Sequence, residues 1–128
     1  MARLLYDLCG IDEGLRLSPY CWRVKYALAH KGLDFETHPW HFTDKQAIEF
    51  SRQGKVPILS DGNETVTDSY RILQYLDRVY PDKPLLGAGA AQERVRFFKF
   101  YSERSLAPGM IRTIIMDLFN AIDPKDRD

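Results

Sequence analysis

A serine, a proline and a cysteine stand together where the first helical pattern of this 128-residue chain begins. Ser18 is a good helix N-cap, and Pro19 suits the first helical position, where a missing N–H costs nothing. Because the N-terminus of a helix carries a partial positive charge, it stabilises an anion such as a thiolate. Ser18 has no thiol, so its hydroxyl can only hydrogen-bond to a thiolate that another molecule supplies. Cys21 is the alternative carrier of thiol chemistry in this segment.

The elements that must position this segment follow from apolar spacing and turn residues. Strands are expected at 3–9, 34–40, 56–59 and 64–67, and helices at 19–31, 44–52 and 69–80. Pro39 is expected to break the second strand, and Asp61-Gly62-Asn63 is a strong hairpin-turn signal. This order predicts an α/β fold with a thioredoxin-like N-terminal domain, a four-stranded mixed sheet with three helices.

A change of composition near residue 87 predicts a second domain. The Gly- and Ala-rich stretch 85–91 is typical of a linker, so we place one domain at 1–87 and the beginning of an all-helical domain at 88–128. Separate helices are expected at 92–106 and 110–119. Since about two helices bury a core poorly, we expect this helical domain to be incomplete.

Composition argues against several classes of protein. The 18 basic and 18 acidic residues balance, so nothing suggests a partner that is nucleic acid or an anionic membrane. No apolar run approaches the roughly 20 residues that a membrane span needs. With two cysteines and no signal-peptide pattern, we expect a reducing cytoplasm. His38 and His41 have no third ligand nearby, so we expect no metal site.

Three ordered motifs make the chain resemble the glutathione S-transferase family. Ser18-Pro19 opens the first helix, Lys55-Val56-Pro57 enters the third strand, and Asp68-Ser69 opens the third helix. Each motif is weak alone, but the three in this order are a strong signal. The resemblance covers residues 3–87 well and residues 88–128 more weakly.

Within that family the chain resembles serine-type enzymes of two kinds. The segment 18–28, followed by Lys31-Gly32 and Phe35, is similar to zeta-class transferases. The Tyr6-Asp7-Leu8 strand and the longer loop before Ser18 are similar to bacterial beta-etherases, which cleave lignin-derived aryl ethers. We therefore expect a beta-etherase-like or zeta-like transferase.

The resemblance implies a glutathione-dependent transferase or lyase with Ser18 as its catalytic residue. The Ser18 hydroxyl would donate a hydrogen bond to the sulfur of the co-substrate glutathione and lower the pKa of its thiol. The thiolate would attack a small electrophilic, aromatic substrate, such as a β-aryl ether, and expel a leaving group. No metal would take part, and the full-length protein would be a homodimer.

The same resemblance assigns five residues to glutathione binding. Pro57 would follow a cis bond that turns the Val56 backbone outward, where it can pair with the cysteinyl part of glutathione. The Lys55 ammonium can reach the glycine carboxylate. Ser69 and the N–H groups around it would hold the γ-glutamyl carboxylate, while Asp68 caps the helix and faces the γ-glutamyl amine.

Two other functions stay open. One is a non-catalytic module that binds glutathione or a protein without turnover. The other is a thiol reductase that works through Cys21, which lies where glutaredoxins keep their resolving cysteine. Ordinary structural roles also stay open: an N-cap for Ser18, a strand-opening proline for Pro57 and a solvated Lys55. The residues do not predict the electrophile, the oligomeric state of this chain or the role of Trp40.

Overall fold

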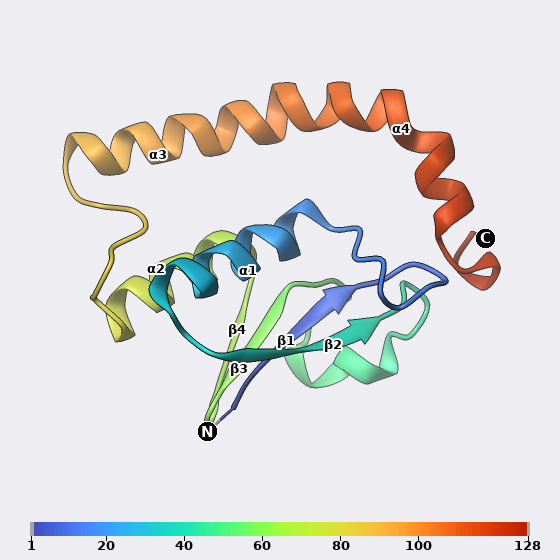
Figure 1. The fold of residues 1–128 in the computed structure, drawn as a ribbon, viewed down its shortest axis with the longest axis horizontal. Coiled ribbons are helices and arrows are strands. Elements are labelled where there is room, and N and C mark those ends of the chain that lie inside the picture. The colour runs from blue at the N-terminus through green and yellow to red at the C-terminus, as the bar shows by residue number, and fades with distance from the viewer. Residues whose placement is uncertain (1, 128) are drawn as a thin grey trace.

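The computed structural model describes residues 2–127 and shows a four-stranded mixed sheet, as the sequence predicts (Figure 1). The strands lie in the order β2-β1-β3-β4. Their bounds are Arg3–Leu8 for β1, Phe35–Trp40 for β2, Ile58–Asp61 for β3 and Glu64–Thr67 for β4. β1 pairs in parallel with β2 and antiparallel with β3, and β3 pairs antiparallel with β4. The predicted thioredoxin-like fold is therefore confirmed.

Alternation along the strands gives the sheet a core on each face. Leu5 and Leu59 are directly paired and face helices α1 (Pro19–Lys31) and α2 (Ser69–Val79), which supply Val24, Leu28, Ile72 and Leu76. Tyr6 and Ile58, the next pair along the strands, face the other way and join a cluster with Trp40 and Ile48. Ile48 comes from η1 (Gln46–Ser51), a 3₁₀ helix where an ordinary short helix was expected.

Pro39 does not break the second strand. β2 continues through Pro39 to Trp40, and Pro39 stands opposite Asp7 in the parallel register. Because β2 lies at the edge of the sheet, a proline with no N–H to donate is tolerated there.

Residues 90–121 form one long helical run instead of the two separate helices expected. α3 (Ala90–Tyr101), the π-helical segment η2 (Ser102–Leu106) and α4 (Ala107–Ala121) follow one another without a break (Figure 1). Pro108, in the first turn of α4, has no N–H to return to the preceding turn, and the wider π turn before it accommodates that loss. The run passes over α1, and its C-terminal end then bends toward the sheet. There Leu118 and Ile122 line the same hollow as Ser18.

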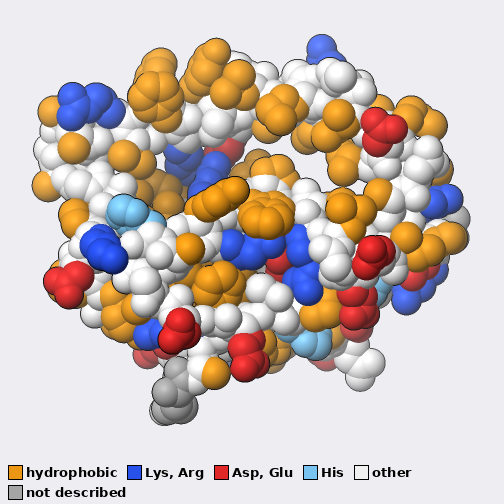
Figure 2. Space-filling view, viewed as in Figure 1, with side chains coloured by type: hydrophobic (Ala, Val, Ile, Leu, Met, Phe, Trp, Pro, Cys, Tyr) orange, Lys and Arg blue, Asp and Glu red, His pale blue; other side chains and the backbone are white. Residues whose placement is uncertain are grey.

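The apolar side chains of this long helix are largely exposed. Phe97, Phe98 and Met110 each keep more than 60% of their surface accessible, at 64%, 63% and 63%. Figure 2 shows hydrophobic side chains gathered along its outer side. None of the helices in residues 2–127 has the length and apolar character that crossing a membrane requires. The domain division at residues 87 and 88 stays a prediction.

Candidate functional site

The structure places five of the six predicted site residues around one hollow of about 310 Å³, which we call the polar cavity. It is lined by Tyr20, Gln53, Lys55, Val56, Pro57, Asp68, Ser69, Lys99 and Glu103. The sixth residue, Ser18, lines a neighbouring hollow of about 340 Å³, which we call the apolar cavity. Tyr20, Lys55 and Val56 belong to both, so the two cavities adjoin.

Ser18 caps α1 as predicted. Its side-chain oxygen accepts a hydrogen bond from the Cys21 N–H at 3.3 Å, and only 8% of its surface is accessible. Because the hydroxyl uses a lone pair for the cap, its hydrogen is free to donate. A thiolate placed in the apolar cavity would receive this donor at the positive end of a helix.

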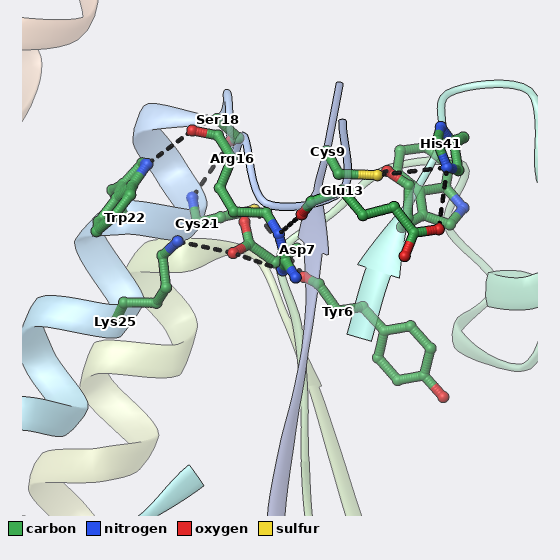
Figure 3. Close-up of polar contacts among 11 residues, drawn as sticks. Tyr6, Asp7, Cys9, Glu13, Arg16, Ser18, Cys21, Trp22, Lys25 and His41 are labelled. Carbon is green, nitrogen blue, oxygen red and sulfur yellow. Dashed lines mark hydrogen bonds and ion pairs between the residues drawn. The ribbon is translucent and has the colours of Figure 1, made fainter. Parts of the chain in front are cut away.

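The thiol of Cys21 lies inside the protein, beneath Ser18 (Figure 3). No surface of Cys21 is accessible, and its Sγ lies 3.9 Å from the carbonyl oxygen of Tyr6. Burial raises the pKa of this thiol to about 11. A protonated, buried thiol is a poor nucleophile, which counts against the reductase alternative.

We expect Cys21 to resist thiol reagents in the folded protein. In a Cys9→Ser variant, 5,5′-dithiobis(2-nitrobenzoate) at pH 8 should leave Cys21 unmodified until urea unfolds the chain, because pH 8 lies well below a pKa of about 11. The matched Cys21→Ser variant reports Cys9, which is also buried. Rapid modification of Cys21 before unfolding would contradict the assignment of a buried, protonated thiol.

Asp68 and Ser69 form the second helix terminus of the site. Asp68 caps α2 as predicted, since its Oδ1 accepts from the N–H groups of Tyr70 and Arg71, both at 3.1 Å. Its φ of 69° is uncommon for a residue with a side chain and costs on the order of 1–3 kcal/mol. Ser69 is buried, and its Oγ accepts from Arg23 at 3.1 Å. The hydroxyl hydrogen of Ser69 is therefore available to a ligand.

The peptide bond between Val56 and Pro57 is cis, as predicted. Pro57 is buried, Val56 is half-buried and Lys55 is exposed. Gln53, which the sequence did not single out, also lines the polar cavity and donates to Thr67 Oγ1 at 2.7 Å. The Val56 backbone and the Lys55 side chain thus line the same polar cavity as the N-terminus of α2.

An ion-pair network closes the polar cavity from the side of the long helix. Arg23 donates to Glu103 Oε1 at 3.0 Å, and Lys99 donates to Glu103 Oε2 at 3.0 Å. Burial alone would raise the pKa of the Glu103 carboxyl, but hydrogen bonds from the two cations hold it below its ordinary value. Lys99 and Glu103 are four residues apart, so their pairing on one face of a helix can be predicted from the sequence. The contact of Arg23 with Glu103 joins residues 80 positions apart and has no local signal.

The aromatic stripe of the long helix does not line the cavity next to Ser18. The stripe consists of Phe97, Phe98 and Tyr101 on α3. Phe98 and Tyr101 instead line a separate hollow with Tyr70 and Leu73. The apolar cavity is walled by Leu8, Leu17, Trp40 and Phe42 on the sheet side and by Leu118 and Ile122 at the far end of the helix. The indole N–H of Trp40 donates to the carbonyl of Asp44 at 2.6 Å.

A buried carboxylate supports the loop that carries Ser18 (Figure 3). Asp7 on β1 is inaccessible, and its Oδ2 accepts from Lys25 at 2.7 Å and from Arg16 at 3.2 Å. Lys25 belongs to α1, and Arg16 lies two residues before Ser18. The indole N–H of Trp22 also donates to the Arg16 carbonyl at 2.9 Å. Asp7 therefore holds both sides of the Ser18 turn to the sheet.

Histidine and cysteine side chains meet at the end of β1 without forming a metal site. His41 Nε2 lies 3.5 Å from Cys9 Sγ and 3.6 Å from Glu13 Oε1 (Figure 3). Within residues 2–127, no group of three or more His, Cys, Asp or Glu side chains is placed to hold a metal ion.

The sheet order, the capped helix at Ser18 and the cis bond before Pro57 define a thioredoxin-like domain. The sequence of residues 14–84 matches the protein-family model described as the N-terminal domain of glutathione S-transferase. The chain belongs to the glutathione S-transferase family.

Individual relatives agree with this assignment. Glutathione S-transferase Z1 of Arabidopsis thaliana is 40% identical over 86 residues, which cover 59% of this chain and 38% of that protein. The structure of glutathione transferase GSTFuA2 from Phanerochaete chrysosporium superposes with a TM-score of 0.85 at 26% identity, over 99% of this chain and 57% of that one. Rice GST1 in complex with glutathione gives a TM-score of 0.66 at 28% identity, over 84% and 50%. The chain thus spans less than two thirds of the proteins it matches.

Proposed function

We propose that this chain forms the glutathione-binding half of a serine-type glutathione transferase. The observation that carries the proposal is the convergence of Lys55, Val56, Pro57, Asp68 and Ser69 on the polar cavity, with Ser18 beside it. The rice relative at 28% identity was solved in complex with glutathione, which supports the same ligand here.

The charges and donors of the polar cavity fit the two ends of glutathione. The γ-glutamyl carboxylate would meet the Ser69 hydroxyl at the positively polarised start of α2. The amine of that residue would face Asp68, and the glycine carboxylate would face Lys55. The backbone of Val56 would pair with the cysteinyl residue, which directs the thiol toward Ser18.

The apolar cavity is the proposed place of the electrophile. Its walls are aliphatic and aromatic, and Ser18 lies at its edge, so a flat aromatic substrate would reach a thiolate held by the Ser18 hydroxyl. Attack would form a carbon–sulfur bond while the leaving group takes the electron pair of the broken bond. In a β-aryl ether substrate that leaving group is a phenolate. The cytoplasmic location and the homodimer stay predictions.

Calorimetry of glutathione binding tests the site directly. We expect Ser69→Ala to weaken binding by about tenfold, because a hydrogen bond to a carboxylate contributes about 1.5 kcal/mol or more. Ser60→Ala on β3 is the matched control, since Ser60 lies outside the polar cavity. Equal binding by Ser69→Ala and the wild-type chain would contradict the proposed carboxylate site. No binding by a cooperatively folded sample would leave only the fold established.

A further inference from the structure

A compact set of contacts holds the C-terminal end of the long helix against two loops of the sheet. We call it the C-terminal latch. Its residues are Gly10 and Ile11 after β1, His41 and Thr43 after β2, and Ala121 and Asp126 at the end of α4 and in η3 (Pro124–Asp126). Figure 1 shows this end of the chain lying beside the loop that follows β1.

The polar half of the latch is the carboxylate of Asp126. Its Oδ1 accepts from both the backbone N–H and the hydroxyl of Thr43, at 3.0 and 2.5 Å. The side chain of Asp126 is fully buried, and its Oδ2 lies 3.9 Å from Nδ1 of His41. Burial would raise the pKa of this carboxyl, but the Thr43 bonds outweigh it and hold the pKa below its ordinary value. Asp126 is therefore a charged anchor whose contacts span 83 positions of the chain.

The backbone half of the latch depends on a glycine. The N–H of Ile11 donates to the carbonyl of Ala121 at 2.9 Å. A Cβ at Gly10 would lie 2.5 Å from that same carbonyl oxygen, a distance that real Cβ atoms essentially never show. Gly10 is thus required for the close approach of the helix end to the β1 loop.

The latch adjoins the wall of the apolar cavity. Leu118 precedes Ala121 by three residues and Ile122 follows it directly, and both line that cavity together with Trp40. The long helix reaches this end of the sheet after a run that begins at Ala90, so its end must be held in place for the wall to have a defined position.

We propose that the C-terminal latch is a specificity device that fixes Leu118 and Ile122 beside Ser18 and so sets which electrophile fits the apolar cavity. The inference rests on the proposed function for its consequence in catalysis. The positions of the latch and of the wall do not depend on it, and Trp40, with 1% of its surface accessible, reports them without turnover.

The experiment compares Asp126→Ala and Thr43→Val, each in a Trp22→Phe background so that Trp40 is the single tryptophan and can be excited selectively at about 295 nm. Loss of one hydrogen bond shifts the equilibrium between the closed and the open latch about fivefold. We therefore expect the acrylamide quenching constant of Trp40 to rise about fivefold in both variants. With 1-chloro-2,4-dinitrobenzene at saturating glutathione, KM should rise about fivefold while kcat and the Kd of glutathione stay within about twofold. Asp117→Ala is the control, because it also removes a carboxylate from this end of the chain but Asp117 is exposed on α4 and is not a latch residue.

Gly10→Ala tests the same contact from the other side and leaves every charge in place. It should reproduce the Trp40 quenching and the KM change. If quenching and KM stay at wild-type values in the folded variants, the latch does not position the wall. If quenching rises and KM does not, the wall does not select the electrophile. A wild-type chain that binds no glutathione would instead overturn the proposed function, and the Trp40 quenching would still decide whether the latch holds the wall.

Discussion

Replacing Ser18 with alanine is expected to reduce kcat/KM at pH 7 by between about tenfold and a hundredfold while glutathione still binds. A hydrogen bond to a charged acceptor contributes about 1.5–3 kcal/mol, or about one to two units in the pKa of the bound thiol. Without the Ser18 donor less of the bound glutathione is thiolate at neutral pH. The rate should therefore recover as the pH rises toward the thiol pKa. Steady-state kinetics from pH 6 to 9, with calorimetry for binding, measure both effects.

Two substitutions at the same position separate catalysis from capping. Ser18→Thr keeps a hydroxyl and should keep most of the activity. Ser18→Asp keeps an N-cap acceptor for the Cys21 N–H but places a negative charge against the thiolate. We therefore expect Ser18→Asp to be at least as stable as Ser18→Ala and less active.

The outcomes for Ser18 discriminate between the functions that the sequence left open. Unchanged activity in Ser18→Ala would show that another group stabilises the thiolate. Glutathione binding without any turnover in the wild-type chain would favour a non-catalytic module. Exchange of a glutathione disulfide that survives in Ser18→Ala and disappears in Cys21→Ser would restore the reductase, against the buried position of Cys21.

Local chemistry explains what the sequence predicts correctly. The caps at Ser18 and Asp68 and the left-handed Gly32, with φ of 70°, each depend on a few neighbouring residues. The hairpin between β3 and β4 is equally local, since Gly62 and Asn63 alone connect them. These short-range signals fix where the elements begin and end, whereas the order of the strands in the sheet was expected from the sequence of elements as a whole.

Long-range contacts explain what the sequence does not predict. The ion pair between Arg23 and Glu103 brings the long helix to the polar cavity and joins residues 80 positions apart. No sequence pattern around either residue predicts this contact. Asp126 binds Thr43 across 83 positions for the same reason. The continuity of the helix past Pro108 was also missed, because proline and glycine together are ordinarily a stop signal. Each of these depends on tertiary packing.

The largest loss of stability is expected from Asp7→Ala. This substitution leaves Lys25 and Arg16, whose side chains are only 12% and 16% accessible, without their shared carboxylate. Removing one partner of a buried ion pair costs about 3–5 kcal/mol, a large part of the stability of an ordinary domain. Urea unfolding followed by circular dichroism should show a much lower midpoint with an unchanged slope. Glu93→Gln is the control: it breaks the exposed contact with Arg96 and should leave the midpoint in place.

A triple variant identifies the cause of that loss. If unpaired buried charge is what destabilises Asp7→Ala, then Asp7→Leu combined with Lys25→Met and Arg16→Met should recover most of the stability, because apolar side chains of similar size often replace a buried ion pair at little cost. The recovered protein should still bind glutathione, since none of the three residues lines the polar cavity. A triple variant as unstable as Asp7→Ala would contradict the charge argument. It would point instead to the attachment of α1 to β1, which the carboxylate of Asp7 provides through Lys25.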